Sequence, residues 1–246
     1  MIVLFTDFGL EGPYIGQVKA RILADAPAAT IIDLFSDAPA HNPKACSYLL
    51  AAYAAEFQTG TVFVAVVDPG VGSERAALAI EADGRWFVGP GNGLLEIAAR
   101  RVGKLATWEI DFDQNSVSAS FHGRDLFAPV AAALERGSDP PFALREASLA
   151  RHRGWPDDLA EIIYIDRFGN GITGLRGYFV KPAFALRVNH VYLESAGVFS
   201  DVSKGSAFWY VNSNGLVEIA VNQGHAAEML GFEVGTEVEF SDPRRS

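Results

Sequence analysis

The first half of the chain alternates apolar runs with amphipathic stretches. The apolar runs predict buried strands at residues 1–6, 29–35 and 61–67. The amphipathic stretches between them predict helices over 14–25 and 42–57, and Asn42-Pro43 is typical of a helix start. This strand-helix-strand-helix-strand order predicts an α/β fold with parallel strands and right-handed crossovers.

The predicted strands and helices then become shorter, but their apolar periodicity continues up to residue 137. Two strands are predicted at 76–82 and 85–88, and Asp83-Gly84 between them is a strong hairpin signal. A glycine-rich loop, Gly89 to Gly93, precedes a helix that ends near residue 101. A strand over 106–112 and a helix introduced by residues 120–125 complete this half.

The second half has a different pattern. From Ser138 to Pro156 the periodicity fails, which indicates an interdomain connection without regular elements. Short strands then follow at close intervals, at 161–165, 172–175, 184–188, 191–193, 207–211, 216–221 and 236–240, with one helix at 226–230. They predict a small antiparallel barrel or sandwich. The expected domains are residues 1–150 and 151–246, with the boundary inside 138–160.

Composition narrows the class of protein. The 246 residues are 49% hydrophobic, which supplies ample core, and the formal net charge of −10 argues against a nucleic-acid partner. The single cysteine, Cys46, allows no internal disulfide and falls in a predicted helix, as a buried apolar side chain would. Residues 1–6 are followed at once by Asp7 and lack a basic leader, so we expect a first strand, no membrane association and a cytoplasmic protein.

Acidic residues follow or end three of the predicted strands. Asp7 and Asp68 come after apolar runs, and Asp33 lies near the end of another. Ligands of open α/β sheets bind outside the carboxyl ends of strands, and Pro69-Gly70 predicts a tight turn that returns Arg75 toward Asp68. Taken alone, this stretch favours an ordinary strand-turn with one solvated acid and one solvated base.

His122 has the most suggestive context of the five histidines, because it stands before a helix and beside Gly123. Histidine is the usual acid-base residue near neutral pH, although a capping or core role is as good an interpretation. The other four, His41, His152, His190 and His225, are interpreted as structural or surface residues. No known metal or cofactor motif occurs, so we expect neither, with a metal site of Asp7, Asp68 and His122 as the alternative.

The second half repeats the sequence of strand, acid and turn at residues 164–170. Phe168 offers a ring face to a flat base, and the amide of Asn170 matches an adenine edge. The simpler alternatives are a core phenylalanine and an asparagine in a left-handed turn. The segment Asn212-Ser213-Asn214-Gly215 is likewise typical of an ordinary hairpin turn.

Six motifs in order carry a resemblance that spans nearly the whole chain. They are Thr6-Asp7-Phe8-Gly9, Val67 to Gly72, Gly89-Pro90 with Asn92-Gly93-Leu94, Phe121 to Asp125, Asp166 to Asn170, and Asn212-Ser213 with Glu218 to Asn222. With these motifs the chain resembles the S-adenosyl-L-methionine (SAM) hydrolases (adenosine-forming), or SAM hydroxide adenosyltransferases. That family is related to the fluorinase and chlorinase enzymes.

The resemblance implies an amino-terminal α/β/α layered domain and a smaller carboxyl-terminal antiparallel β-barrel. It also implies homotrimers with the substrate SAM between the large domain of one subunit and the small domain of its neighbour. Asp7 would hold the ribose hydroxyls, while Asp166 and Ser213 would contact the methionine end. Phe168, Asn170 and the backbone around Asn222 and Gln223 would receive adenine.

By the same resemblance, Asp68, Arg75 and His122 form the catalytic triad that handles water. The halogenases carry a tyrosine at the position of Asp68, so the triad favours water over halide. A carboxylate paired with Arg75 is a poor base but a well-placed orienting acceptor, so His122 is the better acceptor for the proton of water. The expected reaction is attack of water or hydroxide at the ribose C5′ of SAM, which yields adenosine and L-methionine.

Two departures from the family pattern affect the pocket wall. Gly91 stands where an aspartate commonly precedes Asn92, and residues 33–37 lack the usual Thr-His pair. Both bear on substrate affinity more than on the type of reaction. The alternatives to hydrolysis are a nucleoside or SAM binding protein without turnover, a SAM-dependent halogenase and a metal-dependent hydrolase.

Overall fold

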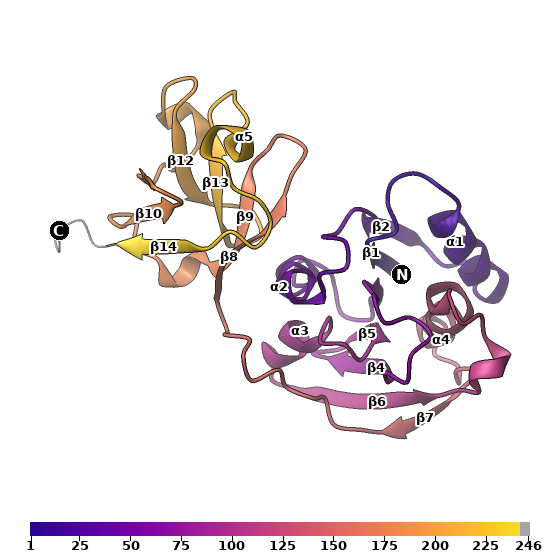
Figure 1. Cartoon of the computed structure of the whole chain (residues 1–246). Coiled ribbons are helices and arrows are strands. Elements are labelled where there is room, and N and C mark those ends of the chain that lie inside the picture. The colour runs from indigo at the N-terminus through magenta and orange to yellow at the C-terminus, as the bar shows by residue number, and fades with distance from the viewer. Residues whose placement is uncertain (242–246) are drawn as a thin grey trace. The chain divides into compact units, whose positions relative to one another are not determined.

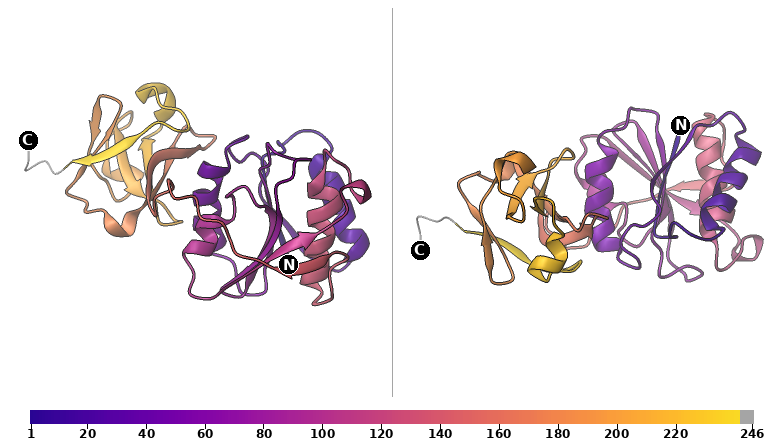
Figure 2. Two further views of the ribbon diagram at one scale, coloured as in Figure 1. Left: turned by 60° about the horizontal axis from the view of Figure 1, so that its bottom comes forward. Right: turned by 90° about the horizontal axis from the view of Figure 1, so that it is seen from above.

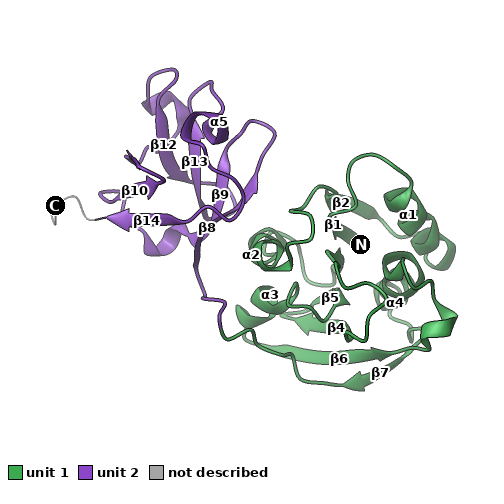
Figure 3. Ribbon diagram, viewed as in Figure 1, with its two compact units in different colours: residues 1–153 green, residues 154–246 purple. Residues whose placement is uncertain are grey.

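The computed structural model describes residues 1–241 of the 246-residue chain. The chain divides into two compact units, Met1–Arg153 and Gly154–Ser246 (Figure 3). Within residues 1–241, none of the helices has the length and apolar character needed to cross a membrane.

Unit 1 is built on a seven-stranded sheet with the order β2-β1-β3-β5-β4-β6-β7 (Figure 1). Its strands are β1 (Ile2–Thr6), β2 (Ile31–Phe35), β3 (Val62–Val66), β4 (Ala77–Ala82), β5 (Arg85–Pro90), β6 (Leu105–Asp111) and β7 (Ala143–Glu146). Strands β2, β1, β3 and β5 run parallel, and the remaining neighbours pair antiparallel. The predicted parallel arrangement of the first three strands is therefore confirmed.

Helices cover both faces of this sheet. They are α1 (Tyr14–Asp25), α2 (Pro43–Ala54), α3 (Glu96–Arg100) and α4 (Ala128–Glu135). Figure 2 shows α1 and α4 on one face of the sheet and α2 on the other. Helix α3 lies next to α2 (Figure 1). The central strands β1 and β3 are buried at every position, which explains why their sequences are continuous apolar runs.

Local signals in the sequence account for the ends of several elements. The Asn42 side chain accepts a hydrogen bond from the backbone N–H of Ala45 at 3.0 Å, and Pro43 occupies the first helical position of α2. Asp83 and Gly84 both have positive φ, at 46° and 75°, in the turn that joins β4 to β5. The predicted cap and hairpin are both confirmed.

The expectation of an irregular stretch over 138–156 is wrong at β7. This strand pairs with β6 at the edge of the sheet, and Arg145 on it forms an ion pair with Asp111. Three of its four residues are exposed and Leu144 is half-buried. Because backbone pairing at an edge needs no apolar period, the hydrophobic pattern does not reveal such a strand.

Unit 2 contains a four-stranded and a three-stranded antiparallel sheet, with the orders β12-β13-β9-β8 and β11-β10-β14. Their bounds are β8 (Leu159–Ile165), β9 (Gly171–Arg176), β10 (Ala185–Val188), β11 (Val191–Leu193), β12 (Ala207–Val211), β13 (Leu216–Val221) and β14 (Val238–Ser241). Helix α5 spans Ala226–Leu230 as predicted. Two isolated bridges, Glu161 to Glu237 and Ser195 to Trp209, link the two sheets. A closed barrel stays a prediction.

Candidate active site

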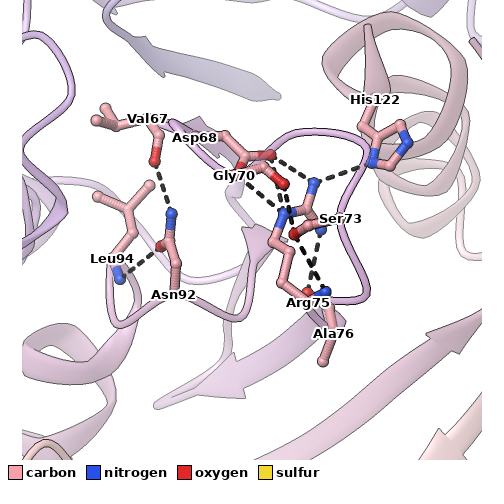
Figure 4. Close-up of polar contacts among 9 residues, drawn as sticks. All are labelled: Val67, Asp68, Gly70, Ser73, Arg75, Ala76, Asn92, Leu94 and His122. Atoms are coloured by element: carbon pink, nitrogen blue, oxygen red, sulfur yellow. Dashed lines mark hydrogen bonds and ion pairs between the residues drawn. The ribbon is translucent and has the colours of Figure 1, made fainter. Parts of the chain in front are cut away.

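Asp68 lies two residues beyond the end of β3, at the carboxyl edge of the parallel strands, as the sequence predicts. Asn92, in the loop after β5, fixes the backbone just before it. Its Nδ2 donates to the carbonyl of Val67 at 2.9 Å, and its Oδ1 accepts from the N–H of Leu94 at 3.2 Å (Figure 4). The chain therefore leaves β3 in a defined direction.

The loop from Pro69 to Glu74 turns the chain back on itself. The Ser73 hydroxyl donates to the carbonyl of Gly70 at 2.7 Å and accepts from the N–H of Arg75 at 3.4 Å. Gly72 has a φ of +79°, and a Cβ there would come within 2.4 Å of the carbonyl oxygen of Ala119. The loop thus packs against the segment that leads to His122, and only glycine fits at this contact.

Arg75 links the other two residues of the predicted triad, Asp68 and His122 (Figure 4). Its Nε donates to both carboxylate oxygens of Asp68 at 2.9 Å, and its Nη2 donates to Asp68 Oδ2 at 2.5 Å. The same Nη2 lies 2.9 Å from His122 Nδ1. The side chains of Arg75 and Asp68 are only 10% and 4% exposed. The three groups therefore form one nearly buried network within unit 1.

His122 is 3% exposed and directly precedes a π-helical turn, Gly123–Phe127, that runs into α4. Because arginine has no acceptor, the hydrogen bond from Arg75 requires an unprotonated Nδ1, which places the proton of the neutral ring on Nε2. Burial, with help from Arg75, holds the pKa of His122 below its usual value, while Asp68 and Asp125 oppose that shift. The ring is thus neutral near pH 7.

The other strand-end acids of unit 1 have separate partners. Asp7 follows β1 and accepts a hydrogen bond from the N–H of His41 at 3.1 Å. Asp33 lies inside β2 and forms an ion pair with Lys19 at 2.6 Å, so it is not part of the site. Among residues 1–241, no three His, Cys, Asp or Glu side chains are grouped so as to hold a metal ion.

Unit 2 has a cavity of about 730 Å³ lined by four of the predicted substrate residues, Asp166, Phe168, Asn170 and Gln223. Asp166 Oδ1 accepts from the N–H groups of Phe168 and Asn170, both at 2.9 Å. Its Oδ2 accepts from Asn170 Nδ2 at 3.0 Å. Asp166 thus shapes the turn that leaves the Phe168 ring 66% exposed and Asn170 6% exposed.

The remaining predicted residues, Ser213 and Asn222, do not line this cavity. Ser213 is exposed in the turn between β12 and β13. The Asn222 side chain donates to the carbonyl of Val202 at 2.8 Å, and its backbone pairs with Gly205 and Ser206. Asn222 therefore holds neighbouring backbone in place within unit 2.

Comparison with known proteins places the chain in a family. The family model of the SAM hydroxide adenosyltransferase N-terminal domain matches residues 2–143, and that of the C-terminal domain matches residues 160–239. The chain belongs to the SAM hydroxide adenosyltransferase family. The resemblance to this family, which the six motifs indicate, is confirmed.

Members of this family with curated names are similar over nearly their whole length. The chain is 35% identical to the (R)-S-adenosyl-L-methionine hydrolase of Thermus thermophilus, over 97% of this chain and 98% of the relative. It is 36% identical to the protein of the same name from Salinispora tropica, over 94% of this chain and 93% of the relative. An uncharacterized conserved protein from Thermotoga maritima has a similar crystal structure, with a TM-score of 0.84 and 32% identity, over 98% of this chain and 99% of that protein.

Six residues that line the cavity were not among the predicted site residues: Phe199, Tyr210, Glu218, Val221, Gly224 and His225. Tyr210 and Glu218 are direct partners in the register of β12 and β13. The one signal in the sequence for a functional residue here was Glu218, a charged residue inside the apolar run 216–221. Asn92 was quoted only as part of a motif, whereas the structure gives it a direct contact with the backbone beside Asp68.

The departure at Gly91 has a steric reason in this chain. A Cβ at that position would lie 3.1 Å from both the Cβ and the carbonyl oxygen of Ala76, and the Gly91 N–H donates to that same oxygen at 2.8 Å. The loop therefore packs tightly on the residue after Arg75. A side chain here would press against Ala76, which separates Arg75 from the start of β4.

Proposed function

We infer that this protein hydrolyses S-adenosyl-L-methionine to adenosine and L-methionine. Water or hydroxide attacks the ribose C5′, a C5′–O bond forms, and the C5′–S bond breaks with its electron pair going to sulfur. Methionine leaves as a neutral thioether, and one proton of the water is released. The observation that carries this inference is the Asp68–Arg75–His122 network in a member of the SAM hydroxide adenosyltransferase family.

We propose that the three residues orient the attacking water. Asp68 neutralises Arg75 and fixes its plane, so one guanidinium nitrogen points at His122 Nδ1. A water that replaces the 2.9 Å hydrogen bond between Arg75 Nη2 and His122 Nδ1 accepts from Arg75 and donates to His122. Arg75 then stabilises the developing hydroxide, and His122 takes its proton on Nδ1. General-base help of this kind is worth about 10² to 10⁴ in rate.

The geometry sets a condition on His122 as the base. Nδ1 already accepts a hydrogen bond from Arg75, so it gains a proton only when that hydrogen bond gives way. The lowered pKa of His122 keeps the ring neutral and ready to accept. Alignment of water with C5′ is worth up to about 7 to 11 kcal/mol, so positioning outweighs basicity.

The remaining site residues keep the roles that the sequence implies, as proposals. Asp7 holds the ribose hydroxyls. Phe168, Asn170 and the backbone at Asn222 and Gln223 receive adenine, while Asp166 and Ser213 take the amino-acid end. The exposed ring of Phe168 and the cavity beside it support this placement.

We further propose a cytoplasmic homotrimer in which residues 1–150 of one copy and 151–246 of the next share each substrate. Exposed apolar side chains support such an assembly, since Leu10, Val71 and Phe168 are 81%, 38% and 66% exposed. The isolated bridges between the two sheets of unit 2 support its closure as a β-barrel. Light scattering of the purified protein tests the trimer, because a monomer mass would contradict it.

The experiment that tests the function is a product assay with and without halide and chelator. Pure protein is incubated with the (R) and (S) sulfonium epimers of SAM, and the mixture is chromatographed. Adenosine and methionine in equal amounts, independent of halide and chelator, are expected. Bound but unchanged SAM would indicate a binding protein, a 5′-halo product a halogenase, and loss of activity with chelator a metal enzyme.

A further inference from the structure

A buried carboxylate, Glu218, lies in the wall of the unit 2 cavity and has no assigned role. It belongs to β13 and is 5% exposed. Its Oε1 accepts from the Tyr210 hydroxyl at 2.6 Å, and its Oε2 accepts from Asn212 Nδ2 at 2.9 Å. Each carboxylate oxygen has about two acceptor sites, so both retain capacity for a further donor.

Asn212 connects this carboxylate to the turn between β12 and β13. Its Oδ1 accepts from the N–H groups of Asn214 at 3.0 Å and Leu216 at 3.1 Å, while its Nδ2 is held by Glu218. Ser213 follows Asn212 directly in this turn. The position of Ser213 is therefore tied to Glu218 through one side chain.

The cavity combines negative charge with aromatic surface. Asp166 and Glu218 both line it, and their hydrogen-bond donors are neutral hydroxyl, amide and backbone groups. Burial, with help from the charge of Asp166, holds the pKa of Glu218 above its usual value, although the two hydrogen-bond donors oppose that shift. Aromatic side chains complete the wall: Phe168, Phe199 and Tyr210. Carboxylates beside aromatic rings suit an organic cation.

We propose that Glu218 is a specificity-determining residue that selects the cationic amino-acid end of the substrate over neutral nucleosides. Its carboxylate adds a second negative charge to that of Asp166 in the cavity, and it holds the turn that presents Ser213. The proposal rests on the proposed function for the identity of the substrate. Glu218 discriminates in binding and takes no part in the attack of water.

The test compares Glu218→Gln with the parent protein for SAM and for adenosine, which lacks the cationic end. The glutamine keeps the volume but removes the charge. We expect the KM for SAM to rise about tenfold, with kcat within about twofold, because a hydrogen bond to a charged group is weakened. The Kd for adenosine stays within about twofold. The control Glu239→Gln removes an exposed carboxylate of the same unit outside this cavity and changes neither constant.

Equal losses of affinity for SAM and adenosine would show that Glu218 only supports the cavity, and unchanged SAM affinity would also overturn the proposal. Tyr210→Phe removes one hydrogen-bond donor to Glu218 but leaves the carboxylate in place. This variant checks whether the cavity loses its structure, and it should preserve the preference for SAM over adenosine. Calorimetry measures the Kd for SAM without turnover, so it separates failure of the Glu218 proposal from failure of the proposed function. If the parent binds SAM without turnover, the loss of SAM affinity in Glu218→Gln still reports on Glu218.

Discussion

The two units use carboxylates in opposite ways. In unit 1 Asp68 is fully paired with Arg75, so the charges cancel within the network and the guanidinium is held in one plane. In unit 2 Asp166 and Glu218 accept hydrogen bonds from neutral donors, in a cavity lined with aromatic rings. A paired carboxylate orients its partner, whereas an unneutralised one attracts a cation.

Under the proposed function, the Asp68–Arg75–His122 network of unit 1 serves the reaction and the cavity of unit 2 serves recognition. Changes in the Asp68–Arg75–His122 network should therefore act on kcat, and changes in the unit 2 cavity should act on KM or Kd. A result in which both kinds of change move the same constant would remove the distinction.

The largest expected effect is that of Asp68→Asn. The amide cannot neutralise Arg75, so kcat should fall about 10² to 10⁴-fold, while the Kd for SAM changes by less than about threefold. Steady-state kinetics and calorimetry measure the two constants. The matched control is Asp111→Asn, which breaks an exposed Asp–Arg pair of the same unit and should leave both unchanged. Parallel losses of kcat and affinity would contradict an orienting role.

Gly72→Ala should give the next largest effect. Its Cβ would collide with the carbonyl of Ala119, so the loop that carries Arg75 must move and kcat should fall about 100-fold. Gly60→Ala is the control, because its φ of +83° imposes the same backbone strain but no atom lies within 4 Å of the added Cβ. Both should lose about 1 kcal/mol of stability through positive φ. An equal loss of kcat in both would assign the effect to strain alone.

Phe168→Ala should weaken binding and leave the chemical step alone. Stacking of a base on an aromatic ring is worth about 1 to 3 kcal/mol, so the Kd for adenosine should rise about tenfold or more. Thermal stability should be unchanged, since the ring is 66% exposed. Tyr178→Ala, which removes a ring that is 90% exposed and outside the cavity, serves as the control. An unchanged adenosine Kd would rule out Phe168 as the base platform.

The smallest effect concerns pH. The pKa of His122 is lowered in the folded protein, so between that value and the usual 6.5 the unfolded chain binds more protons. The free energy of unfolding should then fall as pH drops through this window, and His122→Gln should remove that part of the slope. Chemical denaturation at a series of pH values measures it. A slope that survives the substitution would assign the effect to another group.

Much of unit 1 follows from sequence because its central strands, β1 and β3, are buried at every position and are therefore continuous apolar runs. Every predicted strand there agrees with the structure within two residues. The seven-residue separation of Asp68 and Arg75 across a Pro-Gly turn also allows their pairing to be predicted. Strand β7 could not be predicted, because an exposed edge strand has no apolar period.

Contacts that depend on the pairing register of strands could not be predicted from the sequence. Tyr210 and Glu218 meet only because β12 and β13 pair at those residues. His122 lies 47 residues from Arg75, so their contact requires the loop around Gly72 to pack on residue 119. Sequence suggested the chemistry of Arg75 and His122, but the contact between Arg75 Nη2 and His122 Nδ1 comes from the structure. Because arginine only donates, this contact fixes the tautomer of His122.

The attack of water on C5′ is tested most directly by hydrolysis in ¹⁸O-labelled water. Purified protein is incubated with SAM, and adenosine and methionine are analysed by mass spectrometry. The account predicts one ¹⁸O atom in adenosine, at the 5′ hydroxyl, and none in methionine. Adenosine without the label, or label in methionine, would contradict it.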